Sequence, residues 1–179
     1  MRIVGGKYKG RIFNPGKKFT ARPTTDLAKE ALFNILENRY DLSEMKILDL
    51  FSGTGSIGYE FISRGAYEVT FVEKNYNHIR FIKEVIEKLE ITNARVICDD
   101  VFRFLKNSPE KFDIIFVDPP FDLNALENIP DRIFESQILN QGGVFILEHP
   151  KEFNFLTHQY FREQRKYGKV NFSLFSQSD

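Results

Sequence analysis

The chain has 179 residues, a formal net charge of zero at neutral pH and 42% hydrophobic residues. This length and composition predict one domain with a sizeable core, with a small appendage at most. The single cysteine, Cys98, excludes an internal disulfide and argues against a cysteine-based metal site. We expect a cytoplasmic protein, because no signal peptide is recognisable and no apolar run reaches the ~18 residues of a membrane span.

Residues that often bind metals give no sign of a metal site. The three histidines, His78, His149 and His158, are scattered without metal-ligand spacing, so we expect surface or structural roles for them. Cys98 follows the apolar residues Val96 and Ile97, which predicts a buried and inert thiol. We therefore expect no bound metal.

Charge is distributed unevenly along the chain. Residues 1–22 contain seven basic residues and no acid, so they carry +7 and the remaining residues carry −7. A basic arm on a mildly acidic body predicts a site for a polyanion at the amino end. The alternative is a solvated basic hairpin. The basic residues are Arg2, Lys7, Lys9, Arg11, Lys17, Lys18 and Arg22.

The first predicted elements are a small hairpin and a helix. Residues 2–4 and 8–13 predict two short strands joined through Gly5-Gly6. Thr24-Thr25-Asp26 offers a threonine or aspartate N-cap, and apolar residues at helical spacing then predict a helix to about Arg39.

Strands and helices alternate after this helix. Their order predicts a Rossmann-like α/β fold, with a mostly parallel sheet and helices on both faces. A loose alternation in residues 160–173, with a turn at Gly168, predicts a final antiparallel hairpin. We expect one domain over residues 41–179 and an appendage over residues 1–40. The predicted strands are 46–50, 68–72, 94–98, 112–117 and 144–147, and the predicted helices are 55–64, 76–89, 101–106 and 123–139, the last broken or capped near Pro130.

A glycine-rich loop lies between the first of these strands and its helix. Gly53-Thr54-Gly55-Ser56-Ile57-Gly58 fits G-x-G-x-x-G, in which glycines allow a tight turn and bring backbone amides close to a ligand. Glu73 ends the next strand, 20 residues beyond Gly53, where a carboxylate can accept hydrogen bonds from both ribose hydroxyls of a nucleoside. NAD and S-adenosylmethionine both carry such a ribose.

Charge separates these two ligands. Asp49 ends the strand directly before Phe51-Ser52-Gly53, so the pyrophosphate of NAD would lie near an anion. The ammonium and sulfonium of S-adenosylmethionine favour a nearby carboxylate, so Asp49 favours the methyl donor, although it could merely cap the following turn. Asp100, after the third strand, is placed to bind the exocyclic amine of adenine. The alternative is a helix N-cap, which Asp99 or Asp100 could supply.

Asp118-Pro119-Pro120-Phe121 closes an apolar run, residues 114–117, that predicts a buried strand. Ligands bind at the carboxyl ends of strands in open α/β sheets. The Asp118 carboxylate and two backbone carbonyls can accept the protons of an amine on a planar base, while Phe121 stacks on the ring. The alternative is an ordinary proline turn with Asp118 as a local acceptor. Glu148-His149-Pro150 follows the fifth strand at the same edge and could line this base pocket, although a structural turn is the favoured interpretation.

Residues 49–55 and 118–121 together resemble class I methyltransferases that act on exocyclic amines. The amino end narrows this to a resemblance to the RsmD-type family of bacterial 16S ribosomal RNA (guanine-N2)-methyltransferases, in the same order and over nearly the whole chain. The match departs from the family at Leu27, where members usually carry a basic residue, which weakens the expectation of an extra phosphate contact. The matching segments are Arg2-Ile3-Val4-Gly5-Gly6, Gly10-Arg11, Arg22-Pro23-Thr24-Thr25-Asp26 and Glu30-Ala31-Leu32-Phe33-Asn34-Ile35-Leu36.

The resemblance implies methyl transfer from S-adenosylmethionine to N2 of a guanine, without a metal and with S-adenosylhomocysteine as product. It implies 16S ribosomal RNA or the assembling small subunit as partner, bound by the basic appendage, and we expect a monomer that contacts no membrane. The catalytic candidates are Asp118, Pro119, Pro120 and Phe121. The donor-binding candidates are Asp49, Phe51, Ser52, Gly53, Thr54, Gly55, Glu73 and Asp100. The RNA-binding candidates are Arg2, Lys7, Lys9, Arg11 and Arg22.

Three other functions remain open. A DNA adenine-N6 methyltransferase would use the same four residues at 118–121, and only the amino-terminal resemblance argues against it. An NAD-dependent oxidoreductase would use the glycine loop, but it would leave Asp118 idle, and no acid or base for hydride chemistry is evident. A non-catalytic RNA-binding module would not need Asp118, Phe121 or the glycine loop. The presence of all three argues against this alternative.

Overall fold

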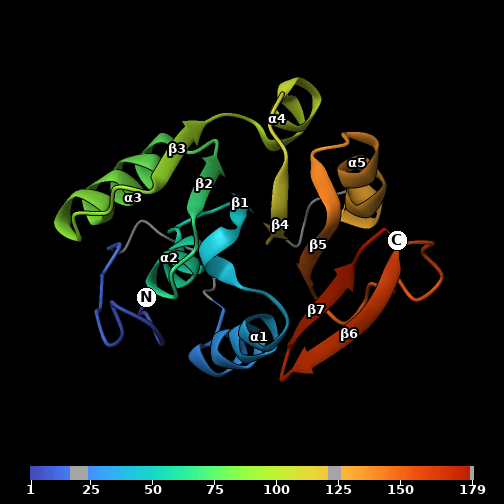
Figure 1. The fold of residues 1–179 in the computed structure, drawn as a ribbon, viewed down its shortest axis with the longest axis horizontal. Coiled ribbons are helices and arrows are strands. Elements are labelled where there is room, and N and C mark those ends of the chain that lie inside the picture. Colours follow the sequence, from blue (N-terminus) through green and yellow to red (C-terminus); the bar gives the residue numbers. More distant parts are fainter. Residues whose placement is uncertain (17–23, 121–125, 178–179) are drawn as a thin grey trace.

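The computed structural model describes residues 1–16, 24–120 and 126–177. Within these ranges, five parallel strands and two antiparallel ones form a seven-stranded sheet in the order β3-β2-β1-β4-β5-β7-β6 (Figure 1). This confirms the predicted mostly parallel sheet and its carboxyl-terminal antiparallel hairpin. The strands are β1 (Lys46–Leu50), β2 (Glu68–Glu73), β3 (Ala94–Cys98), β4 (Phe112–Val117), β5 (Leu139–His149), β6 (Phe161–Tyr167) and β7 (Val170–Phe175).

Helices connect the parallel strands and begin at polar caps. The hydroxyl of Thr25 accepts a hydrogen bond from the Ala28 amide at 3.3 Å, and Asn75 caps the third helix through the Asn77 amide at 2.9 Å. The helices are α1 (Asp26–Arg39), α2 (Ser56–Ser63), α3 (Tyr76–Lys88), α4 (Val101–Asn107) and α5 (Ile129–Glu135), with short 3-10 turns η1 (Leu42–Glu44) and η2 (Leu126–Asn128).

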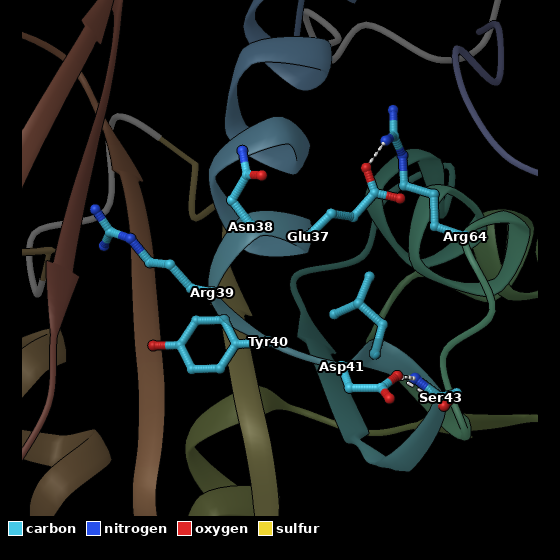
Figure 2. A pocket seen from close by; sticks show the side chains of 8 residues that line it. Glu37, Asn38, Arg39, Tyr40, Asp41, Ser43 and Arg64 are labelled. Atoms are coloured by element: carbon cyan, nitrogen blue, oxygen red, sulfur yellow. Dashed lines mark hydrogen bonds and ion pairs between the residues drawn. The ribbon is translucent and has the colours of Figure 1, made fainter.

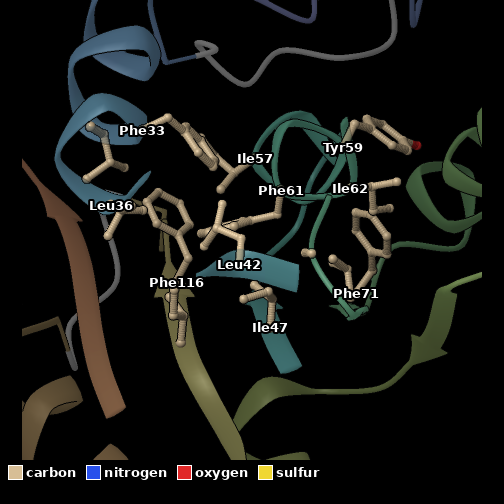
Figure 3. Packing of buried hydrophobic residues seen from close by; sticks show 14 of the residues in the cluster. Phe33, Leu36, Leu42, Ile47, Ile57, Tyr59, Phe61, Ile62, Phe71 and Phe116 are labelled. Carbon is tan, nitrogen blue, oxygen red and sulfur yellow. The ribbon is translucent and has the colours of Figure 1, made fainter. Parts of the chain in front are cut away.

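The sheet has a hydrophobic core on each face, because successive residues of a strand point to opposite sides. Ile47 of β1 packs in one cluster with residues of α1, α2 and α3 (Figure 3). Its neighbour Leu48 packs in a second cluster with residues of α4 and α5. Strands buried on both faces are apolar through their length. The first polar side chains therefore occur where these apolar strands end.

The predicted amino-terminal hairpin is present only in part. One antiparallel bridge joins Arg2 and Ile12, and residues 7–10 form turns, so the predicted strand over residues 8–13 was wrong for its first half. The reason is that Lys7 and Tyr8 bond to α2, whereas Gly10, Arg11 and Phe13 keep backbone hydrogen bonds with residues 1–3. The amides of Lys7 and Tyr8 donate to the carbonyl and hydroxyl of Ser63 at 2.6 and 2.9 Å.

The Gly5-Gly6 pair lets the amino-terminal segment lie directly on α2. Gly6 has φ +68°, and a Cβ there would lie 1.8 Å from the carbonyl oxygen of Ser63. The fully buried Glu60 carboxylate accepts the amides of Val4 and Gly5 at 2.9 and 2.7 Å. These glycines therefore serve close backbone packing, rather than only a hairpin turn.

Two further sequence predictions were wrong in detail. The helix predicted over residues 123–139 begins outside the described residues and ends too late, because α5 stops at Glu135 and β5 begins at Leu139; the predicted break near Pro130 matches the start of α5. Leu139, counted toward that helix, instead begins β5, which is longer at both ends than the predicted 144–147. Cys98 is exposed rather than buried, because β3 is an edge strand of the sheet.

Candidate active site

An acidic side chain stands at the carboxyl end of every parallel strand in the sheet. These ends share one edge, and in open α/β sheets that edge is where ligands bind. The acids lie on adjacent strands, so their charges affect one another. They are Asp49 of β1, Glu73 of β2, Asp99 and Asp100 after β3, Asp118 after β4 and Glu148 of β5.

The glycine loop between β1 and α2 is a tight, left-handed turn. Phe51, Gly53 and Gly55 have φ angles of 55°, 53° and 77°. The hydroxyl of Ser52 donates to the Asp49 carbonyl at 2.6 Å, while Phe51 and Thr54 are half-buried. Hydrogen bonds within the segment therefore fix the shape of the loop, and the loop lies at the carboxyl edge of the sheet, beside the acidic side chains.

Asp49 is buried on the α2 side of this loop. Its side chain is 2% exposed, and its Oδ2 accepts the amide of Gly58, in the first turn of α2, at 3.1 Å. Burial raises the pKa of Asp49 to about 8, with a smaller contribution from the charge of Glu73 and an opposing one from the Gly58 amide. The raised pKa favours the protonated form of Asp49 at neutral pH.

Glu73 joins the end of β2 to the glycine loop. Its Oε2 accepts the amide of Gly53 at 3.0 Å, and its Oε1 accepts the amide of Asn75 at 2.7 Å. His78 Nδ1 lies 3.6 Å from Oε2. Each carboxylate oxygen can accept a second hydrogen bond, so a diol placed above the loop finds two acceptors.

Asp100 caps α4, which is one of the two roles left open by the sequence. Its Oδ1 accepts the amides of Phe102 and Arg103 at 3.0 and 3.2 Å. The neighbouring Asp99 pairs with the Arg103 guanidinium. Among the described residues, Asp100 Oδ2 has no hydrogen-bond partner, so binding of an adenine amine stays a prediction for that atom.

Asp118 follows β4 between the acids of the two adjacent strands. Its amide still contacts the Leu50 carbonyl of β1 at 3.5 Å, and its side chain is half-buried beside the buried Pro119 and the exposed Pro120. Burial, and then the charges of Glu148 and Asp49, raise the pKa of Asp118 well above its ordinary value. Phe121, the predicted stacking residue, lies outside the described residues.

Glu148 is the site residue that sequence reasoning undervalued. Its side chain is 3% exposed, and its Oε2 accepts the Thr24 hydroxyl at 2.7 Å. Burial raises the pKa of Glu148 to about 7. A signal was present in the chain, because Thr24 belongs to the amino-terminal motif that resembles the RsmD-type family, but nothing local connects two residues so distant in sequence.

His149 and Pro150 are structural, unlike the adjacent Glu148. Nε2 of His149 lies 2.8 Å from the Ser173 hydroxyl, and Nδ1 lies 2.9 Å from the Pro150 carbonyl. The ring also packs edge-on against Phe155. Burial lowers the pKa of His149, so the ring is neutral at pH 7. The structural turn favoured by the sequence therefore holds for these two residues.

The predicted RNA-binding residues are exposed wherever the structure describes them. Lys7, Lys9 and Arg11 are exposed on the amino-terminal segment, whereas Arg2 forms an ion pair with Asp26 of α1 at 2.7 Å. Arg22 lies outside the described residues. The ion pair of Arg2 therefore helps to hold the amino-terminal segment against α1, and this leaves less of its charge for RNA.

A cavity of about 510 Å³ lies at the opposite edge of the sheet, where α1 ends and η1 leads into β1 (Figure 2). Its charged groups already have partners, since Arg64 binds Glu37, Arg39 binds Glu163 and Asp41 accepts hydrogen bonds from Ser43. Neither the glycine loop nor Asp118 contributes to its lining, so we do not place the reaction there. The lining residues are Glu37, Asn38, Arg39, Tyr40, Asp41, Leu42, Ser43 and Arg64.

Over the described ranges, the structure contains no group of three or more His, Cys, Asp or Glu side chains able to hold a metal ion. The helices of that same part of the chain include none that is long and apolar enough to cross a membrane.

Residues 1–176 match the family model described as Conserved hypothetical protein 95. The chain belongs to this family. An Escherichia coli (strain K12) relative, named Ribosomal RNA small subunit methyltransferase D, is 35% identical over 152 residues, which cover 85% of this chain and 76% of the relative. The resemblance to the RsmD-type family is therefore confirmed.

Solved structures extend this likeness to the fold. The structure of a hypothetical protein from Thermus thermophilus has a TM-score of 0.87 and 31% identity, and the match covers 99% of both chains. The T. thermophilus 16S rRNA N2 G1207 methyltransferase, solved in complex with AdoMet and guanosine, has a TM-score of 0.70 and 22% identity, over 89% of this chain and 45% of that chain. This second likeness concerns the fold alone, and it agrees with the predicted Rossmann-like α/β architecture.

Proposed function

We propose that this protein transfers a methyl group from S-adenosylmethionine to the exocyclic N2 amine of a guanine in 16S ribosomal RNA. The observation that carries the choice of donor is that two acidic side chains of the protein bond to the glycine-rich segment. Glu73 accepts the amide of Gly53, and Asp49 accepts the amide of Gly58. A pyrophosphate at this loop would lie near both acids, which argues against NAD.

The acidic edge fits a cationic ligand that donates hydrogen bonds. We assign Asp49 to the ammonium of the donor, Glu73 to its ribose hydroxyls and Asp100 to its adenine amine. Phe51, Ser52, Gly53, Thr54 and Gly55 form the wall of the loop around it. When bound, S-adenosylmethionine supplies an electrophilic methyl group on its sulfonium and leaves as S-adenosylhomocysteine.

Asp118 and Pro119 act on the other reactant. The lone pair of the guanine amine is delocalised into the ring, so hydrogen bonds from its two protons to the Asp118 carboxylate and the Pro119 carbonyl would pyramidalise the nitrogen. The lone pair then points at the methyl carbon, and the new N–C bond forms as the S–C bond breaks. The methylated nitrogen is acidic and loses one proton easily, so Asp118 need not be a strong base. Holding both reactants in line can lower the activation barrier by ~7–11 kcal/mol.

The charge state of Asp118 depends on its ligands. In the free protein, burial and the neighbouring acids favour its protonated form. A sulfonium near β1 and an amine that donates to the carboxylate both favour the ionised form. We therefore expect Asp118 to ionise as both reactants bind, and to accept the hydrogen bond in that state.

The amino-terminal appendage, residues 1–40, is assigned to RNA. Lys7, Lys9 and Arg11 supply exposed positive charge for phosphates. The name of the E. coli relative supports ribosomal RNA of the small subunit as the acceptor. The target guanine would leave its stack to reach Asp118, with Phe121 as the proposed new stacking partner.

Nucleoside analysis after methyl transfer tests this proposal. Purified protein is incubated with labelled S-adenosylmethionine and one of three acceptors: 16S RNA transcribed in vitro, the same RNA reassembled with small-subunit proteins, or DNA. N2-methylguanosine from either RNA sample is the expected product. N6-methyl-2′-deoxyadenosine from DNA would instead identify a DNA adenine methyltransferase, and tight NAD binding without methyl transfer would identify the oxidoreductase.

A further inference from the structure

Glu148 lies beside Asp118 on the side away from the donor. Val117 of β4 pairs with Leu147 of β5, so the next residue of each strand stands in register at the sheet edge. Phe116 and Ile146, one residue further back, pack in the same cluster on the α1 face. Alternation along a strand therefore directs both carboxyl groups to that face.

The strand order places Glu148 next to one particular part of the target base. β4 lies between β1 and β5 in the sheet, and the glycine loop follows β1. A base whose amine lies at Asp118, facing a donor above β1, must extend its ring toward β5. One of the two ring nitrogens that flank the amine-bearing carbon, N1 or N3, then meets Glu148, and only N1 of guanine carries a hydrogen that a carboxylate can accept.

We propose that Glu148 determines base specificity by accepting a hydrogen bond from the N1–H of guanine, next to the N2 amine held by Asp118. This inference rests on the proposed function. Guanine presents two adjacent donors, N1–H and N2–H, on its Watson–Crick edge, and two adjacent carboxyl groups match them. Adenine presents an acceptor at N1, so a carboxylate there would repel it.

The hydroxyl of Thr24 makes this carboxylate directional. It donates to Oε2 at 2.7 Å, which leaves Oε1 without a hydrogen-bond partner among the described residues. Oε1 is therefore the oxygen for the base, and Thr24 is a positioning residue. Thr24 directly precedes Thr25, the N-cap of α1, so the helix start and the base pocket are fixed together.

The electrostatics of the pair support the same ligand. Glu148 is buried with Asp118 as its acidic neighbour, and Asp49 lies beyond Asp118 on β1. Two carboxyl groups in one buried site resist ionising together. A ligand that donates to both relieves this repulsion, whereas one that donates to Asp118 alone does not.

A cycle that pairs protein and base substitutions tests the contact. The acceptor is 16S RNA that carries either guanine or 2-aminopurine at the position where the wild-type protein places its methyl group, located first by mass spectrometry. 2-Aminopurine keeps the exocyclic amine but has no N1–H. Single-turnover rates are measured for the wild type, E148L and the exposed control E152Q.

Loss of either partner should reduce the wild-type rate on the order of 10- to 100-fold, as for a hydrogen bond to a charged group. Because both changes remove the same bond, E148L should transfer methyl to 2-aminopurine within about threefold of the wild-type rate for that base. E152Q should match the wild type on both acceptors. Losses that multiply in the double change would overturn the proposal.

Folding and function are controlled separately. Affinity for S-adenosylhomocysteine reports an intact donor site, and if E148L does not fold, T24V takes its place in the cycle. T24V should lower the rate on guanine less than E148L does, and it should change the rate on 2-aminopurine little. T24S, which keeps the hydroxyl, should restore most of the rate on guanine. Absence of any N2-methylguanosine with the wild type would contradict the proposed function itself, whereas normal guanine methylation without coupling contradicts only the role of Glu148.

Discussion

The amide of Gly53 donates a hydrogen bond to Glu73 Oε2 over 3.0 Å, which joins the glycine loop to the end of the next strand. The G-x-G-x-x-G pattern is shared by sites for dinucleotides and for S-adenosylmethionine, so the pattern alone does not identify the ligand. The acids around the loop favour the methyl donor, because a pyrophosphate would lie beside the carboxyl groups of Glu73 and Asp49. We therefore expect a ligand that donates hydrogen bonds to Glu73.

Glu73 should determine donor affinity. We expect E73Q to weaken binding of S-adenosylhomocysteine in calorimetry by about 1.5–3 kcal/mol, because hydrogen bonds from the ribose hydroxyls to a charged acceptor are lost. E73A should lose at least as much, since it also releases the amides of Gly53 and Asn75. The exposed Glu84 of α3 provides the control, and E84Q should bind as the wild type does. Equal affinity in E73Q would refute the assignment.

Asp49 should make donor binding pH-dependent. Its pKa is raised to about 8, so it is mostly protonated at pH 7, and a cationic donor beside it favours the ionised form. Donor binding should therefore release a proton, and affinity should rise with pH up to about 8 and then level off. Calorimetry at pH 7 in buffers of different ionisation enthalpy measures the release. D49N should bind more weakly and release less; an unchanged proton count would assign the release to another acid.

Asp118 should matter for turnover and not for donor binding. We expect D118A to lower the single-turnover rate on the order of 100-fold or more, comparable to the loss of one preorganised polar group in other active sites. Affinity for S-adenosylhomocysteine should stay near the wild-type value, because the carboxylate contacts the target amine. D118N keeps the shape without the charge and should lose nearly as much. A variant that transfers methyl groups at a near-normal rate would exclude the proposed mechanism.

The parallel sheet was predictable because short apolar runs of strand length alternate along the chain with longer segments of helical periodicity. Strand ends follow from the same runs, so the sequence alone is enough to place Asp49, Glu73 and Asp118 at one edge. Asn75 could likewise be named as a cap from residue type alone, and the N-cap of α1 could be limited to Thr24, Thr25 or Asp26. Local chemistry was sufficient wherever the relevant partners are neighbours in the chain.

Contacts between distant segments were not predictable. Thr24 and Glu148 are 124 residues apart, so no local pattern shows that one hydroxyl orients the other residue's carboxylate. The Gly5-Gly6 pair had an adequate local explanation as a turn, while its packing on Ser63 depends on the position of α2. Cys98 was misjudged for a similar reason, because apolar neighbours do not reveal that a strand lies at the sheet edge.

Gly58 should be required for packing of α2 against the sheet. A Cβ there would lie 2.1 Å from Cε1 of the Phe71 ring. Overpacking of this kind costs about 1–3 kcal/mol, and the higher helix propensity of alanine offsets up to about 1 kcal/mol of it, so G58A should be less stable in urea unfolding. In an F71L background the ring is gone, and G58A should then cost much less. A stability loss of the same size in both backgrounds would exclude the ring as its cause.

The amino-terminal segment should bind RNA through charge and leave the donor site unaffected. Lys7, Lys9 and Arg11 are exposed, and residues 1–22 carry +7 against −7 for the rest of the chain. We expect replacement of all three by glutamine to weaken RNA binding and to flatten its salt dependence by roughly 0.7–0.9 in log–log slope for each phosphate no longer neutralised. Arg2 is a poorer choice, because it also pairs with Asp26.

The matched control for this variant neutralises three exposed lysines elsewhere, Lys83, Lys106 and Lys111. It changes the net charge by the same amount, so any purely global effect of charge appears in both proteins. In filter-binding titrations, only the amino-terminal variant should show a flatter dependence of RNA affinity on salt concentration. Both variants should bind S-adenosylhomocysteine as the wild type does. If the two variants lose RNA affinity equally, the segment is a solvated hairpin and the RNA docks on another face.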